Sequence, residues 1–163
     1  MSHGTDDVRL HVASADDANA FVEQRIALLA SLEEFAAGAD LDHLRRETRA
    51  AFAEGLENGD AVTWLAVDGE GEVLGSAVLL VVRRFPSLQN PSRREGYLSH
   101  MFVRPDARRR GIGSALLAAA VAESRHRGLP RLRLHSTAEG RELYDRFGFR
   151  LRTNDMELVL EGA

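Results

Sequence analysis

Apolar and polar residues alternate with two different periods along the chain, and each change of period predicts a change of element. A period of two predicts strands over 8–12, 61–67, 73–82, 97–104 and 131–135, and a closing strand or hairpin over 149–160. Apolar residues at helical spacing predict helices over about 14–32, 41–56, 111–128 and 138–147. The order β-α-α-β-β-β-α-β-α-β joins a hairpin meander to strand-helix-strand crossovers. It predicts one α+β (mixed α/β) domain over residues 1–163, with a mixed sheet.

Composition places the chain among ordinary globular domains. The 163 residues are 44% hydrophobic and 28% charged, which disfavours a disordered or fibrous protein. No apolar run is long enough to span a bilayer, and the polar first residues do not resemble a signal peptide, so we expect a cytoplasmic protein with no membrane partner. The absence of Cys excludes disulfides, thiolate metal sites and a cysteine nucleophile.

The charged residues exclude further classes of binding partner and of chemistry. A net charge of −4 argues against nucleic acid as a partner, including at the Arg-rich segment Arg104 to Arg110. All 21 basic residues are Arg, so neither a Schiff-base lysine nor a Walker-type phosphate lysine is present.

The segment from Val103 to Leu117 carries the clearest chemical signal. It predicts a strand, then an Arg-rich turn containing Gly111 and Gly113, then a helix whose first N–H groups have no partner within the helix. Such a turn favours an anion such as a diphosphate, because glycine lets the backbone approach closely and arginine adds charged donors. A P-loop is excluded by the missing Gly-Lys-Ser/Thr, and a Rossmann site is disfavoured by the missing third Gly.

Two motifs in this order resemble the GNAT superfamily of acetyl-CoA-dependent N-acetyltransferases. The first is Arg108-Arg109-Arg110-Gly111-Ile112-Gly113, and the second is Leu143-Tyr144-Asp145-Arg146-Phe147-Gly148-Phe149. The resemblance covers about residues 60–160 as motifs, and the amino-terminal strand and helices as topology only.

The resemblance implies a sheet that splays between its fourth and fifth strands, with the pantetheine arm of acetyl-CoA in the gap. Here these strands are Tyr97 to Arg104 and Arg131 to Ser136. No metal is expected. The residues that the resemblance implies for acetyl-CoA binding lie on the fourth strand and in the following turn: Met101, Phe102, Val103, Arg108, Arg109, Arg110, Gly111, Ile112, Gly113 and Ser114.

Transfer of an acetyl group to an amine needs a neutral nucleophile and an acid for the departing thiolate. By resemblance Tyr144 faces the sulfur and is the acid. The base is left open among His100, Glu95, His135 and water, because the strand from Tyr97 to Val103 contains no carboxylate. Of these, His100 is the candidate we favour from the sequence, because histidine titrates in the right range. Strand alternation sends His100 and Met101 to opposite faces.

The predicted reaction is direct attack by a primary amine of a small molecule or peptide on acetyl-CoA in a ternary complex. The candidate contacts for the acceptor amine are Glu33, Glu34 and Phe35, and the segment Phe85 to Leu88. The two glutamates would attract a cationic amine. Two alternatives are kept open: a longer acyl donor such as succinyl-CoA, and an acyl-CoA-binding sensor or partner module without catalysis. The resemblance also implies a possible homodimer.

Overall fold

The computed structural model describes residues 7–32, 35, 37–152 and 154–160. The strands and helices follow in the order β1 (Arg9–Val12), α1 (Ala18–Ser31), α2 (Leu41–Asn58), β2 (Ala61–Val67), β3 (Val73–Arg83), β4 (Arg94–Val103), α3 (Ile112–His126), β5 (Leu132–Leu134) and α4 (Arg141–Arg146). Short 3₁₀ turns at Ala15–Asp17 and Pro105–Ala107 precede α1 and α3.

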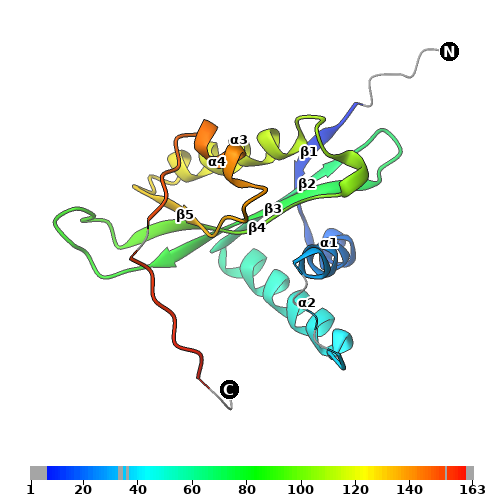
Figure 1. Cartoon of the computed structure of the whole chain (residues 1–163), viewed down its shortest axis with the longest axis horizontal. Helices are drawn as coiled ribbons and strands as arrows, with labels where there is room; N and C mark the ends of the chain where they lie inside the picture. The colour runs from blue at the N-terminus through cyan, green and yellow to red at the C-terminus, as the bar shows by residue number, and fades with distance from the viewer. Residues whose placement is uncertain (1–6, 33–34, 36, 153, 161–163) are drawn as a thin grey trace.

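The five strands form one mixed sheet in the order β1-β2-β3-β4-β5. The first four strands are antiparallel to their neighbours, whereas β5 pairs parallel with β4 after the crossover through α3. Helices α1 and α2 lie on one face of the sheet, and α3 and α4 lie on the other (Figure 1). The predicted mixed α/β fold is therefore confirmed.

Each face of the sheet has its own apolar core. The larger one packs α3 against β2, β3 and β4, and its fully buried residues include Leu116, Leu117 and Ala120. The smaller one lies under α1 and α2, where the rings of Phe21 and Phe52 stack with their centroids 5.2 Å apart. Burial on both faces explains the long apolar runs of β2 and β3.

Strand β4 begins earlier than its alternation predicts, and it contains a bulge. It starts at Arg94 rather than at Tyr97, so Glu95 lies within the strand. The pairing with β3 passes from Val78↔His100 to Leu79↔Leu98, which leaves Ser99 as one extra residue. The bulge brings Leu98 to the same face as Met101, where both contact the larger core.

The prediction of a closing strand over 149–160 is wrong for the part of this segment that the structure describes. Residues 149–152 and 154–160 form no strand, and Thr153 of the expected hairpin lies outside the described residues. Met156 and Leu158 are 99% and 81% exposed. The alternation is compatible with a strand, but a strand also needs an edge to pair with, and this segment leads away from the sheet (Figure 1).

The close approach of β3 to β4 predicts a cost for any side chain at Gly75. A Cβ there would lie 2.8 Å from the Phe102 carbonyl oxygen and 3.3 Å from a methyl of Ile112. We expect Gly75→Ala to lower the free energy of unfolding by about 1–3 kcal/mol in urea titrations, because backbone must shift to admit the methyl. Gly69→Ala, where nothing lies within 4 Å, is the control and should leave the midpoint close to wild type. Equal midpoints for both variants would contradict this packing.

Candidate active site

The site is built where β4 and β5 part. The parallel pairing covers only Gly96↔Leu132, Tyr97↔Arg133 and Leu98↔Leu134, yet β4 runs on to Val103. Residues 99–103 therefore have no strand beside them on the β5 side in the described part of the chain. Backbone N–H and C=O groups at such an edge are free to pair with a ligand that carries amides.

The turn that follows β4 holds its backbone in an unusual conformation. Arg109 has φ 62°, the one positive φ among the described residues other than glycine, and Gly111 has φ 79°. Gly111 is the residue before the first turn of α3, and no side chain caps that end of the helix. The first N–H groups of α3 thus lie uncapped beside three consecutive arginines, an arrangement that favours an anion.

The residues expected to bind acetyl-CoA are brought together by these two elements. Arg108, Arg109, Arg110 and Gly111 are exposed, and the Nε of Arg108 donates to the Val103 carbonyl at 3.3 Å, tying the turn to the end of β4. Other members of the set offer mainly backbone. Gly113 has no side chain, and the remaining side chains are buried or half-buried: Met101, Phe102, Val103, Ile112 and Ser114.

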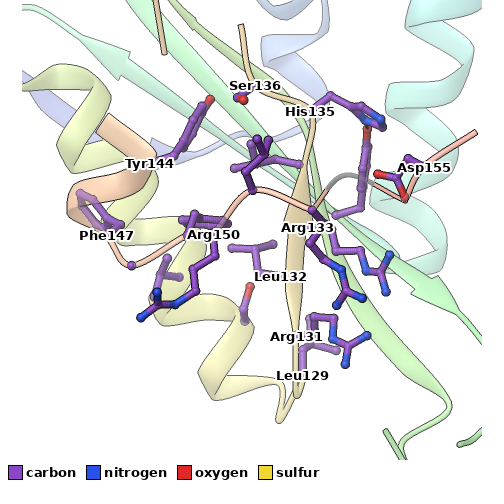
Figure 2. A pocket seen from close by; sticks show the side chains of 18 of the residues that line it. Leu129, Arg131, Leu132, Arg133, His135, Ser136, Tyr144, Phe147, Arg150 and Asp155 are labelled. Atoms are coloured by element: carbon purple, nitrogen blue, oxygen red, sulfur yellow. Dashed lines mark hydrogen bonds between the residues drawn. The ribbon is translucent and has the colours of Figure 1, made fainter. Parts of the chain in front are cut away.

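Tyr144 lies on α4, at the side of the sheet occupied by α3. Its side chain is buried, and its ring meets that of Phe149 edge-on with the centroids 5.8 Å apart. Burial raises the pKa of the Tyr144 phenol, so the hydroxyl keeps its proton at neutral pH. Its hydroxyl points toward Ser136, which lies two residues beyond β5 (Figure 2). A protonated phenol in this position is chemically suited to donate to a leaving group.

A cavity of 1180 Å³ runs around β5 and collects several of the candidate residues. Tyr97, His135, Ser136 and Tyr144 all line it. Figure 2 shows Arg131 and Arg133 on one side of β5 and Leu132 on the other, as strand alternation requires. The cavity adjoins the parting of β4 and β5 but does not include the turn at Arg109.

His100 is deeply buried on the face covered by α1. Its Nε2 lies 2.8 Å from the Ser76 hydroxyl, its ring meets that of Phe21 edge-on, and its Nδ1 has no partner. Burial, with a smaller contribution from the charge of Arg25, lowers the pKa of His100 to about 3. The imidazole is therefore neutral at physiological pH, and only 3% of the residue is exposed.

The other two candidate bases lie in different surroundings. Glu95 is buried in an ion pair with Arg84 at 2.9 Å, and Arg133 is 3.5 Å away. His135 is exposed, and its Nδ1 shares a hydrogen bond with the Tyr97 hydroxyl. Of the three candidates, His135 is the one that lines the cavity together with Tyr144.

The Tyr97–His135 pair and the bulge at Ser99 are features that sequence reasoning missed. Because of the bulge, Tyr97 pairs with Leu80 and His100 with Val78, so both side chains share the face of the sheet covered by α1 and α2. The two partners Tyr97 and His135 are 38 residues apart and meet through the parallel register of β4 and β5. No local pattern in the sequence signals that register.

The candidate acceptor residues that the structure describes do not line the cavity. Glu33 and Glu34 lie outside the described residues, and Phe35 is half-buried. Phe85 and Leu88 are fully exposed at the tip of the β3–β4 hairpin. Within the described residues, the helices are all too short or too polar to cross a bilayer.

Comparison with known proteins identifies the family. Residues 27–149 match the model of the acetyltransferase (GNAT) family. A glucosamine 6-phosphate N-acetyltransferase from Trypanosoma brucei brucei is 30% identical over 90 residues, a match that spans 55% of this chain and 59% of that protein.

Solved structures agree on the fold. A GCN5-related N-acetyltransferase from Ralstonia eutropha superposes with a TM-score of 0.81 at 29% identity, over 95% of this chain and 99% of that one. A predicted acetyltransferase from Clostridium acetobutylicum, solved with acetyl-CoA, has a TM-score of 0.84 at 24% identity, over 93% and 96% of the two chains. The chain belongs to the acetyltransferase (GNAT) family, which confirms the assignment to acyltransferases made from its two motifs.

The buried His100 predicts a loss of stability in mild acid. Its pKa is about 3 in the folded chain and near 6.5 when unfolded, so the unfolded state binds more protons as pH falls below 6.5. Between pH 7 and pH 5 this group should remove about 2 kcal/mol from the free energy of unfolding. His100→Gln, which keeps a polar group near Ser76, should lose less stability than wild type over the same interval in urea titrations. Parallel losses in the two proteins would show that His100 does not titrate in this way.

Proposed function

We propose that this protein is an N-acetyltransferase that moves the acetyl group of acetyl-CoA to the primary amine of a small molecule or peptide. The observation that carries the proposal is the open edge of β4 beyond Leu98, which ends at an uncapped helix with an Arg-rich turn. Acetyl-CoA has an extended pantetheine arm that contains amides and ends in a diphosphate. The arm matches the open edge of β4, and the diphosphate matches the Arg-rich turn that follows it. The structure of the Clostridium relative with acetyl-CoA supports the same ligand.

In this proposal the backbone does most of the cofactor binding. The edge of residues 99–103 pairs with the pantetheine amides, while the first N–H groups of α3 and the guanidinium groups of Arg108 to Arg110 hold the diphosphate. The pantetheine arm then runs along β4 from the turn toward Leu98, where the pairing of β4 with β5 begins. The thioester comes to lie near the cavity that Tyr144 lines.

Tyr144 is proposed as the acid. When the amine attacks the thioester carbon, the tetrahedral intermediate collapses by breaking the carbon–sulfur bond, and the sulfur leaves with the electron pair. The Tyr144 hydroxyl, which burial keeps protonated, donates a proton or hydrogen bond to that sulfur. The chain has no Cys, so the acyl group passes directly to the amine without a cysteine acyl-enzyme.

Among the three candidate bases, we favour His135. It is exposed in the cavity, whereas His100 is buried against Ser76 and Glu95 is held by Arg84. A proton acceptor at Nε2 of His135 requires that Nδ1–H donates to the Tyr97 oxygen, and the observed pair allows this tautomer. Tyr97 would then be a positioning residue that orients the imidazole.

The first experiment is release of CoA thiol from acetyl-CoA by the purified protein, with and without amines. The amine panel begins with glucosamine 6-phosphate, because two similar proteins are named as glucosamine 6-phosphate N-acetyltransferases. It continues with other amino sugars, polyamines, amino acids and peptides. Amine-dependent release is the expected result. If acetyl-CoA binds but no amine causes release of CoA thiol, the result would favour the acyl-CoA sensor. A faster rate with succinyl-CoA would identify succinyl-CoA as the preferred acyl donor.

Tyr144→Phe tests the acid. The change removes one oxygen from a buried ring and keeps the contact with Phe149. We expect kcat to fall by about 10²-fold or more, with the Kd of acetyl-CoA within about twofold of wild type. Phe147→Tyr, on the same helix end and partly exposed, is a control that should leave kcat unchanged. An unchanged kcat in Tyr144→Phe would remove the assigned role.

His135→Gln and His100→Gln together identify the base. We expect His135→Gln to lower kcat about 10²-fold or more while the Kd of acetyl-CoA stays close to wild type, because the group that accepts the amine proton is gone. His100→Gln should keep kcat close to wild type, since His100 is buried against Ser76 and does not line the cavity. The opposite outcome would assign the base to His100, and two unaffected variants would leave Glu95 or water as the base.

A further inference from the structure

The cavity around β5 is strongly basic, although the chain as a whole is acidic. Seven arginines line the cavity against three acidic side chains, whereas the net charge of the chain is −4. Within the part of the chain that the structure describes, none of these three acidic side chains forms an ion pair. A cavity with such an excess of positive charge attracts anions and raises their local concentration.

Two of these arginines are held at the cavity by one buried carboxylate. Glu95 is 3% exposed, and its Oε1 lies 2.9 Å from the Nε of Arg84 and 3.5 Å from the Nε of Arg133. The Nε of Arg133 is buried and has no hydrogen-bond partner. Because one carboxylate neutralises only one of two guanidinium groups, the cluster keeps a net positive charge. The side chains of Arg84 and Arg133 are 54% and 35% exposed, so both guanidinium groups reach the cavity.

The two arginines share a face of the sheet with the Tyr97–His135 pair. Tyr97 is the β4 partner of Arg133 in the parallel register. Glu95 lies two residues before Tyr97, and His135 lies two residues after Arg133. Two residues along a strand span about 7 Å and return to the same face. Figure 2 accordingly shows Arg133 and His135 on the same side of β5.

The chemistry of these side chains is that of an oxyanion site. Arginine stays charged at physiological pH, and its planar fork donates two parallel hydrogen bonds to two oxygens of one phosphate or carboxylate. Arg131, two residues before Arg133, forms no ion pair with a described residue and adds a further donor. The proposed diphosphate site does not use these arginines, because the cavity does not include the turn at Arg109.

We propose that the amine accepted by this protein also carries a phosphate or a carboxylate, and that Arg84 and Arg133 form the anion site that binds this group. The amine lies at His135, about one two-residue step along the strand from Arg133. The proposal rests on acetyl transfer as the function of the site. Glu95 is then a positioning residue, because it holds both guanidinium groups and touches no substrate. An amine without an anionic group binds more weakly, since it leaves the anion site without a partner.

Binding is measured first, by calorimetry with CoA in place of acetyl-CoA, so that no transfer is required and the diphosphate site is filled. The probes are three pairs of amines that differ by one anionic group: glucosamine 6-phosphate and glucosamine, phosphoethanolamine and ethanolamine, and glycine and glycinamide. We expect at least one anionic member to bind about 10-fold or more tightly than its counterpart. The phosphate and carboxylate pairs show which anion the site takes. Equal affinities, or no binding, in all three pairs would overturn the proposal.

Arg133→Gln and Arg150→Gln are the matched variants. Both remove one positive charge from the lining of the cavity, but Arg150 lies on the other side of β5 (Figure 2). We expect Arg133→Gln to reduce the preference for the anionic member about 10-fold and Arg150→Gln to keep it close to wild type. Arg84→Gln leaves Glu95 paired with Arg133, so it tests the site should Arg133→Gln fail to fold. Equal losses in Arg133→Gln and Arg150→Gln would show that only the total charge matters and would overturn the anion site.

Turnover with the same pairs separates this proposal from the proposed function. Release of CoA thiol from acetyl-CoA should have a lower KM with the anionic member, and Arg133→Gln should remove most of that difference. Unequal binding without release from any amine would overturn acetyl transfer and support the anion site. Release with equal kcat/KM for both members of every pair would support the transferase and overturn the anion site.

Discussion

Strand β4 has two different edges, and the arrangement of the site depends on that difference. On one side it is paired with β3 along its whole length, whereas on the other side β5 accompanies it for three residues only. The long pairing fixes β4 within the sheet, and the short one leaves backbone amides open beside the helix end at Gly111. A ligand that needs both hydrogen bonds and an anion site finds them on one continuous stretch of chain.

The bulge at Ser99 determines which side chains share a face of the sheet. It sends Leu98 and Met101 into the core beneath α3, and it turns Tyr97 and His100 to the side of α1. Acid and base candidates are therefore separated by the sheet except around β5, where Tyr144 and His135 reach one cavity. Proton removal from the attacking amine and proton donation to the departing sulfur are two separate proton transfers at one reacting carbon.

The order of elements up to α4 could be predicted because helical and strand periods are local, and so could the turn between β4 and α3, whose arginines and glycines lie within six residues. The bulge at Ser99 could not, because one extra residue against β3 changes no local pattern. The pairing of Tyr97 with His135 depends on a parallel register that loop lengths do not determine. The prediction of a closing strand over 149–160 failed for another reason. Alternation shows that a segment prefers to form a strand, but it does not show whether the same chain offers a sheet edge for that strand to pair with.

Because β4 and β5 pair in parallel, the strands of the sheet cannot all pair at the same stage of synthesis. β2, β3 and β4 follow one another through hairpins, so they can pair as soon as they leave the ribosome. β5 reaches β4 only after α3 has been synthesised, and it adds three residue pairs. The β5 side of the cleft is therefore held by fewer strand pairs than either of the two hairpins, and we expect it to open before them in a partial unfolding event.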